Sequence, residues 1–327
     1  MSANHYVRHL SYRTFYLLHV ALAPLLFPLL FLHVSHIRVY LLPSAALFAA
    51  DQALKYYLRV PALATVSTPA SAPGLLTITV TLSSPLPSAP APGSHCLLRH
   101  APTSFWTANP FTIVPGGGGG DGGGSTKQLR LVARVRSGFT RELASLAGSR
   151  PVAVTLDLPF GPPPPDLDRF DRVLLVAGGV GATFAVGWVR RLLAAESASV
   201  RFVWAVKTAA EAAWALDDPA VAGCVELFVT GVTGDDADAD GIEMTEGLLA
   251  GGAVDALARE GVARDRIARG RPHLRRVVGE TVLRAGEGRT AVLVCGPAGM
   301  AAAVKRAVAR LGIEGRDVWL HVEEFGH

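Results

Sequence analysis

The chain has 327 residues, half of them hydrophobic, and a formal net charge of +4 at pH 7. This charge is modest and dispersed, without a basic run or a patch interleaved with aromatic residues, which excludes a nucleic-acid-binding protein. The three cysteines, Cys96, Cys224 and Cys295, lie far apart without paired spacing. They exclude a disulfide framework and a zinc site, and they fit a reducing compartment.

The first predicted element is a membrane hairpin over residues 1–60. Residues 15–34 carry no charge and reach the roughly 20-residue length of a spanning helix. A second, weaker segment is apolar from Val39 to Ala50 and then becomes amphipathic. Basic residues precede the first segment and follow the second, which places both ends of the hairpin on the cytoplasmic side. We therefore predict an integral membrane protein, of the plasma membrane, with a large cytoplasmic part.

The first apolar segment has a histidine at each end, His19 and His33. In a helix, fourteen steps of about 1.5 Å and 100° place them about 21 Å apart and on one side. That geometry suits two metal centres stacked across a bilayer, and the alternative is ordinary packing between helices. Pro24 and Pro28 lie between the histidines and would kink the helix. His36 is a substitute for His33 with a poorer facing angle.

Short alternating apolar runs begin near Thr65 and predict the antiparallel strands of a small β-barrel over residues 61–165. The runs are 75–82, 94–100, 128–136 and 151–158. The glycine tract at 115–125 predicts a flexible insertion between two strands, and the proline-rich segment 159–170 predicts a stiff linker.

Two barrel segments that follow predicted strands carry candidate ligand groups. Residues 109–114, "NPFTIV", offer an aromatic ring and a hydroxyl beside a rigid proline, which suits the edge of an isoalloxazine ring. Residues 134–143, "RVRSGFTREL", offer Arg136, a glycine turn and Thr140 ahead of a helix, which suits a phosphate. The alternative for both is an ordinary loop.

Beyond the linker, strands alternate with helices, and this pattern predicts a doubly wound parallel α/β domain over residues 166–327. The expected strands are 172–178, 200–207, 225–230 and 290–296. The expected helices are 182–195, 209–216 and 299–312. The fold class is therefore multidomain: a helical hairpin, an antiparallel barrel and an α/β domain.

Two glycine-rich turns are expected at the carboxyl ends of strands in the α/β domain, where open α/β sheets bind ligands. "LVAGGVGATFA" places Gly178, Gly179 and Gly181 between a buried strand and a helix, where glycines let the backbone approach a pyrophosphate. The alternative is a tight connection. "VLVCGPAGM" repeats the arrangement around Cys295, whose alternative role is that of a small core residue.

In this order the motifs resemble the ferric reductase/NADPH oxidase family, and they are most similar to fungal ferric and cupric metalloreductases. The resemblance runs from about Tyr12 and includes "WAVK" (204–207), "GRP" (270–272) and the C-terminal "EEFGH" (323–327). It implies a haem-binding helical membrane domain joined to a ferredoxin–NADP reductase-like module. It further implies FAD on the barrel, NADPH on the α/β domain, and haem b between paired histidines of two helices.

The resemblance also assigns roles to residues of this chain. Those expected to hold FAD are Asn109, which replaces the family's usual histidine, Pro110, Phe111, Thr112, Arg136, Gly138, Phe139 and Thr140. Those expected to hold NADPH are Gly178, Gly179, Gly181, Thr183, Gly296 and Pro297, with Lys207 and Arg271 at its 2′-phosphate. The two residues expected to act in catalysis are Cys295, beside the nicotinamide, and Phe325, which would guard the flavin face.

The haem assignment depends on a second helix. His19 and His33 match the histidine-bearing helix of the family, which carries about six spans, whereas only the last two match here. Haem iron takes two axial ligands, so haem b is expected only with a partner helix from a missing membrane segment or a partner subunit. Two alternatives stay open for the N-terminus: Met1 is the true start, or the chain is a fragment of a longer protein.

The resemblance implies that electrons pass from cytosolic NADPH through FAD to ferric or cupric ions or their chelates. Two alternatives remain open at this stage. A superoxide-generating NADPH oxidase shares the same motifs and differs in its acceptor. A truncated or regulatory membrane protein without transmembrane electron transfer is favoured by the missing spans.

Overall fold

The computed structural model describes residues 12–100, 108–114, 126–161, 165–231, 257–258, 261–284 and 288–323. The chain divides into two compact units, Met1–Arg59 and Val60–His327.

The first unit holds two helices, α2 (Tyr12–His33) and α3 (Arg38–Tyr57), joined by the short 3-10 helix η1 (Ser35–Ile37). We predicted two membrane spans here. Within the described residues, no helix combines the length and the apolar character that crossing a bilayer requires. In α3 an ion pair joins Lys55 Nζ to Asp51 Oδ2 at 2.7 Å, which makes its last turns polar. The predicted helices therefore form, but the structure does not identify them as spans.

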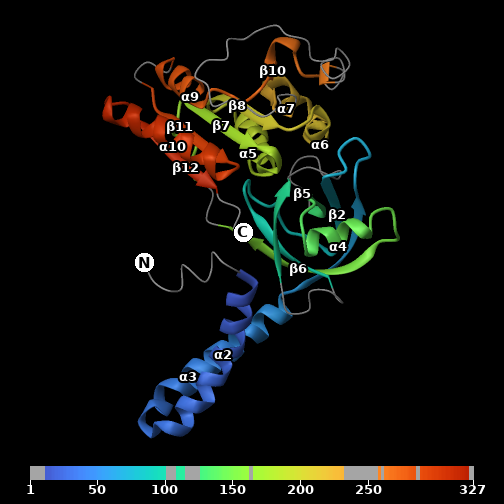
Figure 1. The fold of residues 1–327 in the computed structure, drawn as a ribbon, viewed down its shortest axis with the longest axis vertical. Helices are drawn as coiled ribbons and strands as arrows, with labels where there is room; N and C mark the ends of the chain where they lie inside the picture. The colour runs from blue at the N-terminus through green and yellow to red at the C-terminus, as the bar shows by residue number, and fades with distance from the viewer. Residues whose placement is uncertain are drawn as a thin grey trace. The chain divides into compact units, whose positions relative to one another are not determined.

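The second unit begins with a closed antiparallel barrel of six strands, in the order β1-β2-β5-β4-β3-β6 (Figure 1). The strands are β1 (Val60–Ser67), β2 (Leu75–Leu86), β3 (His95–Arg99), β4 (Asn109–Val114), β5 (Thr126–Arg134) and β6 (Val152–Phe160). A short helix, α4 (Phe139–Ser145), follows β5. Ala62, Ala64 and Val66 of β1 are buried while their neighbours are exposed, because side chains of a strand alternate between its faces.

One sequence prediction within the barrel was wrong. We expected "NPFTIV" to follow a strand as a loop, but these residues form β4, which pairs antiparallel with β3 and β5. Thr112, Ile113 and Val114 are β-branched, and such residues favour a half-buried strand. Pro110, which cannot donate a backbone hydrogen bond, lies near the exposed start of the strand.

The second part of this unit is a six-stranded parallel sheet in the order β10-β9-β8-β7-β11-β12. Its strands are β7 (Arg172–Gly178), β8 (Ser199–Val206), β9 (Val225–Val229), β10 (Ile267–Arg269), β11 (Thr290–Cys295) and β12 (Val318–Glu323). Helices on one side are α5 (Ala182–Ala195), α6 (Ala213–Leu216) and α7 (Pro219–Cys224), and those on the other are α9 (Leu274–Leu283) and α10 (Ala298–Ile313). The predicted barrel and doubly wound sheet are both confirmed.

Burial on both faces explains why β7 is apolar along nearly its whole length. Leu175 and Ala177 belong to the apolar core shared with α5, whereas Leu174 and Val176 belong to the core shared with α9 and α10. A parallel strand covered on both sides is expected to read as a continuous apolar run.

The barrel and the α/β domain share an apolar core. Val114 of β4 and Val132 of β5 lie in the same buried cluster as Trp188 and Val189 of α5. Burying apolar side chains across this boundary stabilises one arrangement of the barrel on the sheet. The interface therefore holds the ends of β4 and β5 against α5.

Candidate functional site

Two glycine-rich turns meet at the carboxyl edge of the parallel sheet. Strands β7 and β11 are paired neighbours, and η2 (Gly179–Gly181) follows the first while Gly296 and Pro297 follow the second. A Cβ atom on Gly181 would lie 2.2 Å from the carbonyl oxygen of Cys295, and one on Gly178 would lie 2.6 Å from Cδ of Pro297. The glycines at 178 and 181 thus allow the two turns to touch.

Gly181→Ala should lower the free energy of unfolding by roughly 1–3 kcal/mol, because the added methyl group overlaps a backbone carbonyl that cannot move aside freely. Urea unfolding of the purified chain measures this. Gly279→Ala is the matched control: it lies inside α9 with no atom within 4 Å of the added Cβ. That change should instead stabilise by roughly 0.5–1 kcal/mol. A Gly181 variant as stable as the natural chain would contradict the contact between the turns.

Two of the predicted ligand residues turn their side chains into the protein. The side chain of Thr183 is only 2% exposed, and its hydroxyl donates to the carbonyl of Val180 at 2.8 Å. Cys295 is only 1% exposed, and its burial, with the nearby charge of Glu323, raises the pKa of its thiol. Both side chains therefore lie inside the turns, and the roles expected for Thr183 and Cys295 at the dinucleotide stay predictions.

All three thiols should react slowly in the folded protein. Burial raises the pKa of Cys96 to about 12 and that of Cys224 to about 11. With a pKa of about 11, only about 0.1% of Cys224 is thiolate at pH 8. The rate of labelling by a thiol reagent should therefore rise about tenfold per pH unit beyond pH 9, where an ordinary cysteine has levelled off.

The same shifts define a pH dependence of stability. The fold prefers the protonated thiols, so this contribution is complete below about pH 9 and is lost as the pH rises through 11 to 12. Rapid labelling of all three thiols at pH 7.5 without denaturant would contradict their burial.

An ion pair joins the barrel to the α/β domain directly over the first glycine turn. Nη2 of Arg134, on β5, lies 3.1 and 3.0 Å from the two carboxylate oxygens of Glu211, which is almost fully buried. The same carboxylate accepts a hydrogen bond from the backbone N–H of Lys207 at 3.2 Å. A Cβ on Gly179 would lie 3.5 Å from the guanidinium of Arg134. Sequence reasoning missed this pair.

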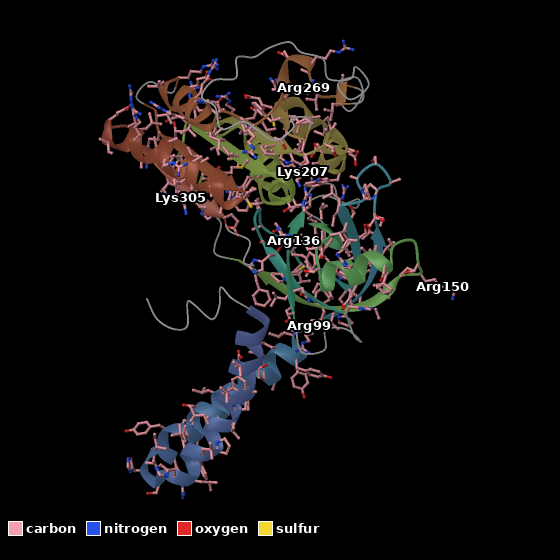
Figure 2. The ribbon with its side chains drawn as sticks, viewed as in Figure 1. Arg99, Arg136, Arg150, Lys207, Arg269 and Lys305 are labelled. Atoms are coloured by element: carbon pink, nitrogen blue, oxygen red, sulfur yellow. The ribbon has the colours of Figure 1, made fainter. Side chains whose placement is uncertain are left out.

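Two exposed cations stand at the same edge of the sheet. Lys207 follows β8, and Arg271 follows β10 after a turn at Gly270, whose φ is +84°. These strands flank β9, which puts their ends about 10 Å apart at the usual strand spacing. Within the described part of the chain neither side chain has a carboxylate partner. Figure 2 labels Lys207 in the α/β domain.

On the barrel side, β4 offers an amide without a partner. The Nδ2 atom of Asn109 is buried and makes no hydrogen bond among the described residues. Phe111 is only 7% exposed and packs inside the barrel against Phe139, with ring centroids 6.1 Å apart. The ring of Phe111 therefore belongs to the barrel core, and its expected role at the flavin ring stays a prediction. Pro110 is exposed and Thr112 is nearly buried beside it.

The turn before α4 has the form predicted for a phosphate-binding segment. Gly138 has φ +76°, which favours glycine, and no atom lies within 4 Å of a Cβ placed there. The hydroxyl oxygen of Thr140 accepts a hydrogen bond from the backbone N–H of Arg136 at 2.9 Å, which closes the turn. Figure 2 labels Arg136 on the barrel, near the end of β5.

The remaining predicted residues are Phe325 and the two expected haem ligands of the first unit. Phe325 lies outside the described residues. His19 and His33 both lie on α2, and the side chain of His33 is exposed. Within the described residues no group of three or more His, Cys, Asp or Glu side chains is placed to hold a metal ion.

The residues present fit the two expected cofactors. The amide of Asn109, which has no partner among the described residues, and the open glycine turn at Gly138 are groups that FAD can satisfy. The glycine turn at Gly179 and the cations Lys207 and Arg271, which have no carboxylate partner among the described residues, suit the phosphates of a pyridine dinucleotide. An antiparallel barrel packed on a parallel sheet with these groups defines the ferredoxin–NADP reductase-like class of fold.

Comparisons with known proteins agree with this class. Residues 170–309 match the family model of the ferric reductase NAD binding domain, so the predicted resemblance to ferric reductases is confirmed for this part of the chain. Ferric reductase transmembrane component 6 of Saccharomyces cerevisiae is 35% identical over 96 residues, which are 28% of this chain and 12% of the yeast protein. The match thus spans a small part of that relative.

Solved structures show the same fold at low identity. A ferredoxin NADP+ reductase from Neisseria gonorrhoeae, with bound FAD and NADP, has a TM-score of 0.54 and 11% identity, and covers 81% of this chain and 98% of its own. A flavohemoglobin from Malassezia yamatoensis, with bound FAD and heme, has a TM-score of 0.54 and 15% identity, and covers 87% of this chain and 66% of its own.

Proposed function

We propose that this protein is a flavin-dependent oxidoreductase that passes electrons from NADPH, through FAD, to ferric or cupric ions. The observation that carries the proposal is the contact between the two glycine turns of a ferric reductase NAD binding domain, at the sheet edge beside the barrel. NADPH delivers two electrons as hydride and metal ions accept one, and bound FAD supplies the chemistry that connects these steps.

The chain's own residues bind the two cofactors and orient them. Asn109 and the turn at Gly138 hold the flavin on the barrel, and the turn at Gly179 receives the pyrophosphate on the sheet. Arg134 and Glu211 fix the barrel above that turn, with the guanidinium 3.0 Å from the carboxylate. Hydride transfer requires alignment of two rings and no proton transfer by a side chain, so positioning is the chain's contribution.

The two cations at the sheet edge support NADPH, and not NADH, as the electron donor. Lys207 and Arg271 are exposed there, and a guanidinium suits bidentate contact with a 2′-phosphate. An NAD-selective site of this kind places an acidic side chain near the ribose.

We also propose that the first unit lies in a membrane. Leu22, Leu26 and Leu29 of α2 and Leu47 and Phe48 of α3 are each more than half exposed, and such a surface is expected to lie against lipid. His19 and His33 would hold haem b there only with a second histidine-bearing helix. Sedimentation of the full chain with membranes after a carbonate wash supports the setting, and release by that wash contradicts it.

Asn109→Leu tests the flavin site directly. Replacing a buried, unpartnered amide with an apolar side chain should leave the stability of the cofactor-free chain unchanged or raise it. If FAD accepts a hydrogen bond from that amide, the same change should weaken FAD binding about fivefold to tenfold. Fluorescence titration with FAD measures the affinity, and thermal unfolding without FAD measures the stability.

The natural chain with FAD should also oxidise NADPH with ferricyanide as acceptor, and then with a ferric chelate. Ser149→Ala, on the exposed surface after α4, is the control and should change neither FAD affinity nor rate. A purified chain that binds no FAD and oxidises no NADPH would overturn the proposed function.

A further inference from the structure

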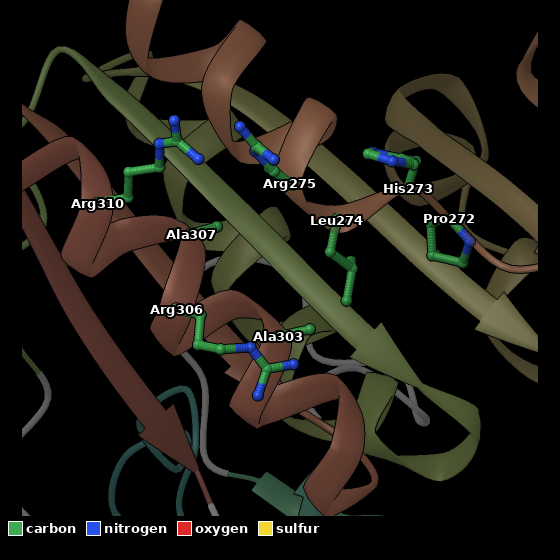
Figure 3. A pocket seen from close by; sticks show the side chains of 8 residues that line it. All are labelled: Pro272, His273, Leu274, Arg275, Ala303, Arg306, Ala307 and Arg310. Carbon is green, nitrogen blue, oxygen red and sulfur yellow. The ribbon is translucent and has the colours of Figure 1, made fainter. Parts of the chain in front are cut away.

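A cationic groove lies between α9 and α10, on the outer side of the parallel sheet (Figure 3). It encloses about 400 Å³, and its lining comes from the start of α9 and the middle of α10. The lining residues are Pro272, His273, Leu274, Arg275, Ala303, Arg306, Ala307 and Arg310. None of these eight is acidic.

The groove exists because α10 presents small side chains to its neighbour. Ala303 and Ala307 are one helical turn apart, and they leave space where longer side chains would fill the seam. With Leu274 and Pro272 they make an apolar floor, and the arginines of both helices stand around it. A volume of this size is at the lower end for small-molecule sites, which span about 300–1,000 Å³.

The charges of the groove are poorly neutralised. Within the described part of the chain, neither Arg275 nor Arg306 has a carboxylate partner. Arg310 has one, Glu314, whose carboxylate oxygen lies 3.4 Å from Nε in an exposed pair that lines the adjoining hollow. The helix α10 carries no acidic residue from Ala298 to Ile313. The N-terminus of α9 adds its partial positive charge at the same place.

From this arrangement we infer that the groove is a second anion site, which binds a phosphate group attached to a small apolar or planar body. Guanidinium groups from two helices match the oxygens of a phosphate, and the apolar floor accommodates the remainder of the molecule. Like charges brought together around one groove are stabilised when an anion lies between them.

On the α9 side the groove adjoins the proposed dinucleotide site, because Pro272 directly follows Arg271, but its α10 side lies farther from the glycine turns. Arg306 and Arg310 lie about 12 and 18 Å along α10 from its start at Ala298, at about 1.5 Å per residue. The turn at Gly296 lies just before that start. The backbone positions of Arg306 and Arg310 therefore lie well away from the glycine turns of the sheet edge.

Binding of inorganic pyrophosphate to the full chain, measured by calorimetry at low salt, tests the inference. Arg275→Ala and Arg306→Ala should each weaken binding about tenfold or more, because each removes a charge-assisted contact. Arg276→Ala is the matched control: it lies on the same helix, is exposed, and is paired with Glu280 at 2.7 Å. It should change the affinity less than twofold. Equal losses in all three variants would show unspecific attraction and overturn the inference.

Two further arms identify the source of the phosphate and the independence of the site. Binding to vesicles that contain a phosphoinositide, compared with vesicles of neutral lipid, distinguishes a lipid headgroup from a soluble phosphate. If neither pyrophosphate nor the phosphoinositide vesicles bind in a way that depends on the groove arginines, the inference is overturned. Saturating NADP+ should leave pyrophosphate binding unchanged, whereas competition would assign the arginines to the dinucleotide site. Because the readout is binding, these arms remain decisive if the proposed function fails.

Discussion

Arg134→Ala should lower the free energy of unfolding by about 3 kcal/mol, because it leaves the buried carboxylate of Glu211 without its cation. This value is at the lower end for a broken buried pair, since about a quarter of the Arg134 side chain is exposed. The change should also slow flavin reduction by NADPH while FAD remains bound, because the barrel is no longer fixed above the glycine turn. Urea unfolding and anaerobic stopped-flow measurement check the two effects.

Two controls separate this ion pair from a general loss of charge. Arg150→Ala removes an exposed arginine between α4 and β6, also labelled in Figure 2, and should change the stability by less than about 0.5 kcal/mol. The double variant Arg134→Ala with Glu211→Ala should be less destabilised than the sum of the single changes. Equal urea midpoints for the Arg134 and Arg150 variants would show that the bridge contributes nothing.

The local pattern of apolar residues and glycines in the sequence predicted the α/β domain well. The bounds of β7 and α5 follow from the sequence, because an apolar run buried on two faces ends at glycines and a long helix begins directly after them. The meeting of the two glycine turns was also predictable, since the carboxyl ends of parallel strands share one edge. These features depend on residues that are close in sequence or on a general rule of topology.

The barrel was harder to predict because its pairing is long-range. Asn109 and Pro110 are typical of turns, so the segment resembles a loop. It becomes β4 only because β3 and β5 both pair with it. Arg134 and Glu211 are 77 residues apart, and no local pattern links them. Arg130 and Arg134, four residues apart and therefore on the same face of β5, are a sequence signal that this face meets an acidic partner.

The direction in which side chains point was the second feature that could not be predicted from the sequence. Cys295 ends a strand that is buried on both faces, so no polar alternation in the sequence indicates which way its thiol points. In the same way, Phe111 lies in a run of four buried residues, and the sequence could not distinguish the barrel core from a ligand-facing surface. Packing of distant strands decides both cases.

Arg271→Ala should raise the KM for NADPH by roughly 10- to 150-fold and leave the KM for NADH nearly unchanged, because a charge-assisted contact is worth about 1.5–3 kcal/mol. Arg271 is exposed after β10, across β9 from Lys207, and in the proposed function its guanidinium contacts the 2′-phosphate, the group that distinguishes the two cofactors. Lys207→Ala should act in the same direction with a smaller effect, since an ammonium makes no bidentate contact. Arg276→Ala is the control and should alter neither KM. Equal changes in KM for both cofactors would show that Arg271 supports the fold of the sheet edge and does not read the phosphate.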